Sequence, residues 1–315
     1  MTMALSRARA LGLIATAPAF VARRASAQTS TTMRIGAGLS STLLEPFLAS
    51  DWGFFKRAGI DVEVVPLAAN TGVMVQAVLG GSLDAALADP IQMAESRVRN
   101  LPLAFFAGGA MSSSSAPLDS LCVINSSPIK TARDLEGQTV AVLVVNSTLD
   151  IAVKDWLRLQ GADSTKVKFF EMPFPTMLSA LQRGTVASAF IGEPFLSAAR
   201  SEVRVLGNCY DAIAPLFFIT SWFSTHDWLT KNPQLARKFV QAIYETARWA
   251  NAHRPERAST YAKYAKLDPK IFAGMNWPQY GTSLEPRFMQ PLIDSAVRHG
   301  LLEKPVAAAD LIAKP

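Results

Sequence analysis

The feature that most constrains the fold of this chain is an internal repeat at a separation of 103 to 105 residues. Two short matches in one frame carry it: Asp51-Trp52 returns as Asp155-Trp156, and Gly81-Ser82-Leu83 returns as Gly184-Thr185-Val186. Each copy then reaches an acidic residue followed by proline, at Asp89-Pro90 and at Glu193-Pro194. The sequence therefore predicts two similar units in tandem.

Within each unit, apolar periodicity and glycine stops predict the order strand, helix, strand, helix, strand. The first unit has strands at 33–37, 61–66 and 83–87, a helix at 43–57, and a helix between 69–72 and 80–81. The second has strands at 139–142, 167–172 and 186–191, with helices at 147–160 and 176–183. Because crossover helices join parallel strands and must cover a sheet face, this order predicts an α/β fold with two lobes, each built on a mainly parallel sheet.

Two extended apolar segments, 120–124 and 217–223, lie where the chain would cross between the lobes. The chain after residue 223 has mostly helical periodicity, so we expect it to return to the first lobe. The sequence thus predicts that residues 33–122 and 220–315 form lobe 1 and that residues 123–219 form lobe 2.

The N-terminal segment, residues 1–27, is typical of a secretory signal. Arg7 and Arg9 precede a short apolar stretch, and Ala25-Ser26-Ala27 forms an A-x-A cleavage box. The apolar stretch is about half of the ~20 residues that a membrane-spanning helix needs. We expect cleavage near Ala27 and export to the periplasm, by either the general or the twin-arginine route.

The charge distribution argues against a nucleic-acid partner. The formal net charge is +6, but residues 1–27 contribute four arginines and no acid, which leaves only +2 on the remaining chain. The sequence has no CxxC pair or HExxH motif, so we expect no metal and no cofactor. Cys122 and Cys209 could form a disulfide in an oxidising compartment, although we favour two buried thiols.

Ligands of open α/β sheets bind beyond the carboxyl ends of the strands, where helices begin. Two facing lobes would bring six such loops around one cleft. The candidate ligand-binding residues are taken from these loops, with one ring from the second crossing segment: Leu39, Ser40, Ser41, Asn70, Thr71, Asp89, Asn146, Ser147, Thr148, Phe174, Glu193, Phe195 and Trp222. Helix capping is the alternative role for the Ser, Thr and Asn side chains.

The acids and the aromatic residues bear on the kind of ligand. Asp89 and Glu193 could either stabilise helix N-termini or accept hydrogen bonds from a ligand, in which case they would disfavour nitrate or a sulfonate. A stacking wall for an aromatic ring could come from Phe174, Phe195, Trp222 and Trp277. The residues favour a small aromatic or heterocyclic ligand over an inorganic anion.

Several longer motifs carry a family resemblance: Glu45-Pro46-Phe47-Leu48-Ala49, the run from Trp52 to Glu63, GGSLDAALADP at 80–90, FIGEP at 190–194, Lys231-Asn232-Pro233 and Arg254-Pro255-Glu256. Over residues 33 to 260 the chain resembles the periplasmic substrate-binding proteins of the nitrate, sulfonate, taurine and thiamine-pyrimidine-precursor import family. The resemblance implies a type II periplasmic-binding fold that closes by a hinge. It also implies a monomer that delivers a small molecule to the permease subunits of an ABC transporter.

Other functional classes fit less well. The stretch from Gly36 to Ser41 lacks the third glycine of a dinucleotide fingerprint, and no G-x-S-x-G elbow indicates a hydrolase. No nucleophile–base pair or metal cluster is visible, so we expect a binding protein and not an enzyme. A ligand-sensing or scavenging protein without transport, and an enzyme of the pyrimidine-precursor synthase type, remain as alternatives.

Overall fold

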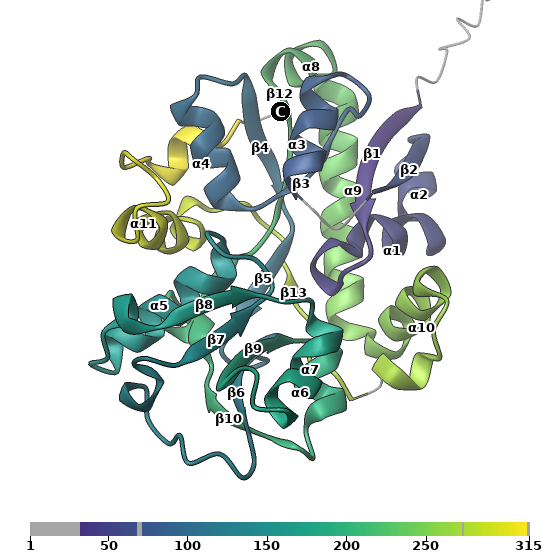
Figure 1. Ribbon diagram of the computed structural model, residues 1–315. Coiled ribbons are helices and arrows are strands. Elements are labelled where there is room, and N and C mark those ends of the chain that lie inside the picture. The colour runs from purple at the N-terminus through teal and green to yellow at the C-terminus, as the bar shows by residue number, and fades with distance from the viewer. Residues whose placement is uncertain (1–31, 68–70, 273, 314–315) are drawn as a thin grey trace, which may run out of the picture. The chain divides into compact units, whose positions relative to one another are not determined.

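The computed structural model describes residues 32–67, 71–272 and 274–313. The predicted signal peptide and Asn70 lie outside the described residues. The first unit contains β1 (Met33–Gly38), α1 (Glu45–Asp51), α2 (Phe54–Arg57), β2 (Val62–Leu67), α3 (Thr71–Leu79), β3 (Ala86–Ala88), α4 (Pro90–Val98), β4 (Leu103–Gly108) and β5 (Ala110–Ser113). Figure 1 shows these elements in its upper half.

The second unit contains β6 (Asp119–Ile124), β7 (Thr139–Val142), α5 (Thr148–Leu159), β8 (Lys168–Glu171), α6 (Phe174–Gln182), β9 (Ser188–Gly192), α7 (Phe195–Ala199) and β10 (Val203–Gly207). The chain then returns through β11 (Leu216–Phe218), β12 (Ser221–Thr225), α8 (His226–Lys231), α9 (Pro233–Ala252), α10 (Arg254–Ala265), β13 (Gln279–Tyr280) and α11 (Gln290–Arg298). The α/β class predicted from the sequence is confirmed.

The two lobes have the same strand order. The second sheet runs β10-β6-β9-β7-β8, with β7 parallel to β8 and β9 and with β6 antiparallel to its neighbours. In the first lobe, β1 pairs in parallel with β2, and a parallel bridge from Ile35 to Ala85 links β1 to the chain entering β3. Strand β12 lies antiparallel between β3 and β4. The order β2-β1-β3-β12-β4 therefore repeats β8-β7-β9-β6-β10.

The segments predicted to cross between the lobes are the antiparallel strands of the two sheets. Strand β6 follows the first unit in sequence but pairs with β9 and β10 of the second, from Asp119 onward. The change of lobe predicted at residue 122 stays a prediction, although its pairing puts β6 in the second sheet from Asp119 onward. The segment 217–223 is two strands: β11 pairs with β5 in a separate sheet, and β12 joins the first lobe.

The helix predicted at 43–57 is interrupted. A 3-10 turn at Ser41–Leu43 precedes α1, and α2 begins only after Gly53. Gly53 has φ +71°, in the left-handed region that side chains disfavour, so the helix ends before it and restarts after it. The interruption turns α2 so that Phe55 stacks on Phe239 of α9, with ring centroids 5.8 Å apart.

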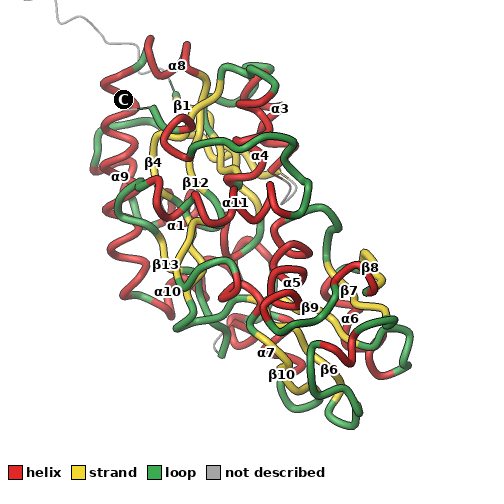
Figure 2. Tube along the Cα trace, turned by 90° about the vertical axis from the view of Figure 1, so that its left-hand side faces the viewer, coloured by secondary structure: helices red, strands yellow, loops and turns green. Residues whose placement is uncertain are grey.

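The two repeat-related aspartates hold the C-terminal helices. Asp51 of α1 accepts hydrogen bonds from Lys263 and Tyr264 of α10, each at 2.8 Å. Asp155 of α5, which is fully buried, accepts from Arg298 at 2.8 Å and forms further bonds to α11. Helix α11 also packs against α4, as Figure 2 shows, so it contacts elements of both lobes rather than belonging wholly to lobe 1.

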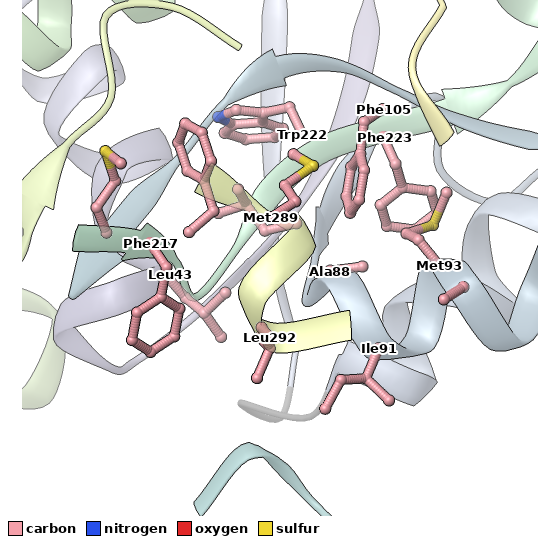
Figure 3. Packing of buried hydrophobic residues seen from close by; sticks show 14 of the residues in the cluster. Leu43, Ala88, Ile91, Met93, Phe105, Phe217, Trp222, Phe223, Met289 and Leu292 are labelled. Carbon is pink, nitrogen blue, oxygen red and sulfur yellow. The ribbon is translucent and has the colours of Figure 1, made fainter. Parts of the chain in front are cut away.

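The core of the first lobe contains a buried acid. Trp222 has no exposed surface and lies among apolar side chains in Figure 3, next to Met289. Its indole Nε1 donates to Oε2 of Glu45 at 2.8 Å, while Oε1 of Glu45 has no hydrogen-bond partner among the described residues. Burial raises the pKa of Glu45 to about 8, so the carboxyl holds a proton at neutral pH.

Cys122 and Cys209 are both buried free thiols in this structure, as we favoured from the sequence. Burial raises the pKa of Cys122 to about 12, which makes its thiol a poor nucleophile. None of the described helices combines the length and the apolar character that crossing a bilayer requires.

We expect Glu45→Gln to flatten the pH dependence of the free energy of unfolding. Because the pKa of Glu45 is about 8 in the folded protein and 4.5 in the reference state, the folded state keeps a proton that the unfolded chain releases. This contribution to stability is complete below pH 4.5 and is lost as the pH rises toward 8, by about 4 kcal/mol between pH 5 and pH 8. Urea denaturation across this range measures the slope.

The matched control is Glu63→Gln, at an exposed position of β2, which should leave the slope unchanged. Equal slopes in the wild type and in Glu45→Gln would contradict a protonated Glu45.

Candidate ligand-binding site

In the first lobe, the loop after β1 is held by hydroxyl groups from the C-terminal part of the chain. The carbonyl oxygen of Ser41 accepts from Tyr280 at 2.8 Å, and that of Leu39 accepts from Tyr261 at 3.3 Å. Ser40 precedes the 3-10 turn in an extended conformation and makes no side-chain cap. Leu39 is 42% exposed. The loop therefore presents an apolar side chain, while its backbone is held by the hydrogen bonds from Tyr261 and Tyr280.

The loop after β3 is a capping arrangement. Asp89 accepts from the backbone N–H of Gln92 at 3.0 Å, which caps α4, and from the hydroxyl of Thr71 at 2.9 Å. Burial raises the pKa of Asp89. Asp89 therefore caps α4 and binds Thr71 in this structure. Ligand contact by either residue stays a prediction.

In the second lobe, the loop after β7 leads directly into α5. Ser147 accepts from the N–H of Leu149 at 3.2 Å, and Asp150 accepts from the N–H of Ser147 at 2.7 Å, which forms a reciprocal cap. Thr148 is the first residue of α5. Asn146 is exposed and has φ +58°, a left-handed conformation that asparagine tolerates better than most residues. Of these three, Asn146 has the most exposed side chain.

Glu193 connects the second lobe to the segment between α10 and β13. Its Oε2 accepts from the N–H of Ser197 at 3.1 Å, and its Oε1 accepts from the Ser197 hydroxyl at 2.9 Å and from the N–H of Asn276 at 3.1 Å. The Asn276 side chain in turn donates to the carbonyl oxygen of Pro117 at 2.9 Å. Protein donors thus satisfy both carboxylate oxygens.

Phe174 and Phe195 are partly exposed and come together at the end of β9. Their ring centroids are 6.4 Å apart. A Cβ atom on Gly192 would lie 2.7 Å from the Phe174 ring and closer still to Oδ1 of Asp119. Because glycine has no Cβ, the Phe174 ring can lie directly against the backbone at position 192.

Asp119 is a functional candidate that the sequence analysis did not find. It begins β6 and lies against Gly192, with a hydrogen bond to Tyr210. Burial, together with the charge of Glu193, raises the pKa of Asp119 to about 7. No strand-to-helix loop contains it, so only the pairing of β6 with β9 could have placed it here.

Trp222, one ring of the predicted aromatic wall, is part of the core in this structure. It is fully buried, and its indole N–H is bonded to Glu45, so it presents no surface to a ligand. Trp277 is also buried, at 4% exposure. Because the residues around Trp222 are apolar on both sides of the strand, the sequence does not show on which face of the sheet its ring lies. Of the four rings expected to form a wall, Phe174 and Phe195 are partly exposed in this structure, and ligand contact at any of the four stays a prediction.

The family model described as "NMT1/THI5 like" matches residues 43–258 of this chain. The aliphatic sulphonate binding protein SsuA from Escherichia coli has a TM-score of 0.74 at 21% identity, covering 90% of this chain and 92% of that one. The SsuA protein from Xanthomonas axonopodis pv. citri, bound to MOPS, has a TM-score of 0.70 at 17% identity, with coverage of 90% and 98%.

The fold is therefore that of the periplasmic binding proteins, as the resemblance implied. The chain belongs to the NMT1/THI5-like family. The desulfurization enzyme DSZB also shares the fold, with a TM-score of 0.68 at 15% identity and coverage of 90% and 96%. A comparison with curated protein sequences found no match.

We expect Glu193→Gln to lower the free energy of unfolding by about 1–3 kcal/mol. The hydrogen-bond partners of the carboxylate among the described residues are all donors, so an amide NH2 placed there would lose a charge-assisted bond and face another donor. Chemical denaturation measures the change. The exposed Glu303→Gln serves as the control. A Glu193 variant as stable as that control would show that the carboxylate does not hold the segment at Asn276.

Proposed function

We propose that this protein is the solute-binding component of an ABC import system. The observation that carries the proposal is the pair of repeated sheets in a chain of the NMT1/THI5-like family. The strand-to-helix loops present the exposed Leu39 in the first lobe and the partly exposed Phe174 and Phe195 in the second. Because both lobes supply strand-to-helix loops, the two sets of loops can enclose a small molecule between them. The permease subunits of the transporter are the proposed partners.

The ligand is a small organic molecule of the sulfonate, pyrimidine or aromatic type. The similarity to SsuA proteins, one of them bound to MOPS, supports the sulfonate class. The rings of Phe174 and Phe195 favour a ligand with an aromatic or other apolar body. We propose that the protein acts in the periplasm as a monomer after cleavage near Ala27.

The lobe division that this function requires is also a proposal. The pairing of β5 with β11 brings the two chain crossings side by side, so a few residues at 114–118 and 208–215 could absorb a hinge rotation. The first lobe then comprises residues 33–113 and most of the chain from 216, and the second comprises residues 119–207.

The test is native mass spectrometry of the protein purified from its own periplasm. We expect one small molecule bound to each chain, released on denaturation and unchanged in mass after long incubation. A ligand that is converted would favour an enzyme, the alternative that the shared fold of DSZB raises. A protein that carries no small molecule and takes up none from periplasmic extract would contradict the proposal.

A further inference from the structure

Arg257 of α10 is a buried cation, and no anionic partner for it is found among the described residues. Its exposure is 3%, and its one hydrogen bond within the described residues runs from Nη1 to the carbonyl oxygen of Pro278 at 2.8 Å. The buried Nε of Arg257 has no hydrogen-bond partner in the part of the chain that the structure describes. A guanidinium normally uses several N–H donors, so most of its capacity is unused.

Arg257 packs against the segment 276–280, which contacts candidate loops of both lobes. Its guanidinium stands over the rings of Trp277 and Tyr280, at 5.2 and 5.8 Å from their centroids. Tyr280 holds the carbonyl oxygen of Ser41, in the loop after β1. One residue before Trp277, the N–H of Asn276 binds Glu193 of the second lobe. These contacts link Arg257 to the candidate loops of both lobes.

The surroundings of Arg257 do not balance its charge. The two aromatic faces attract the cation, but weakly compared with a carboxylate. Burial lowers the pKa of Arg257, and the positive charge of Arg254 acts in the same direction. Removing a charge from water without a counter-charge is costly, so an uncompensated buried guanidinium is kept at a cost to stability. A bound ligand with an anionic group would supply the missing counter-charge and so account for this cost.

The geometry points to Arg257 as the residue that binds the acidic group of the ligand, a carboxylate or a sulfonate. This inference rests on the proposed solute-binding function and names the charge of the solute. A planar guanidinium offers two parallel N–H donors to either acid group, which lysine cannot do. Both oxygens of Glu193 are bonded to Ser197 and Asn276, so this carboxylate is not available to accept a hydrogen bond from the ligand.

The inference changes an expectation drawn from the sequence. The sequence predicts that the acids at 89 and 193 disfavour an anionic ligand if they contact it, but both are bonded to groups of the protein itself. The buried charge that lacks a counter-charge among the described residues is that of Arg257. Its position inside α10, outside every strand-to-helix loop, gave no sign of this in the sequence. The ligand is then an organic acid with an apolar body.

The test uses two pairs of probes that differ in charge alone: benzoate with benzamide, and propanesulfonate with propanesulfonamide. We expect at least one acid to raise the melting temperature of the wild type more than its amide does, with an affinity at least tenfold higher by calorimetry. In Arg257→Met this preference should disappear, whereas Arg257→Lys should keep a reduced preference. The pair that shows the effect identifies the carboxylate or the sulfonate.

The matched control is Arg254→Met, which removes the same charge from an exposed position of α10 and should keep the preference. Without probe, Arg257→Met should melt at the same temperature as the wild type or higher, because a buried unpaired charge has been removed. A lower melting temperature with an unchanged preference for acids would make Arg257 a structural residue and overturn the inference. So would a wild type that shows no preference for either acid.

Failure of this inference is distinguishable from failure of the proposed function. An uncharged ligand recovered with the native protein would overturn the role of Arg257 and leave solute binding intact. Recovery of an acid would support both.

Discussion

The insertion of each crossing strand into the sheet of the other unit is the constraint on which the structure depends. Strand β6 leaves the first unit and pairs with β9 and β10, and β12 leaves the second and pairs with β3 and β4. Both strands run antiparallel in otherwise parallel surroundings. Because backbone hydrogen bonds fix them, β3 and β9 end at the same point of each repeat, one residue before Asp89 and Glu193 respectively.

Buried polar groups then attach the C-terminal helices to this frame. Asp51 and Asp155 stand at equivalent places of α1 and α5, and they bind α10 and α11 respectively. Arg298 and the surrounding donors hold the pKa of Asp155 well below its usual range against the effect of its burial. The repeat therefore determines where the C-terminal helices dock, and α10 in turn brings Arg257 to the candidate site.

Local patterns were sufficient to predict the elements of the repeat from the sequence. The strand at 139–142 has the predicted bounds, and α5 differs from its prediction by one residue at each end. Gly53 was not recognised as a break because the apolar spacing continues through it. The sites of Asp119 and Arg257 depend on contacts between segments far apart in the chain, as does the burial of Trp222 against Glu45. No local pattern encodes such contacts, so the sequence could not predict them.

The central claim is that one ligand contacts loops of both lobes at once. Hydrogen exchange, followed by mass spectrometry on the protein with and without its copurified ligand, tests this most directly. The account predicts that bound ligand slows exchange at 39–43 of the first lobe and at 193–197 of the second, to similar extents and at the same ligand concentration. Slower exchange confined to the loops of one lobe would contradict it.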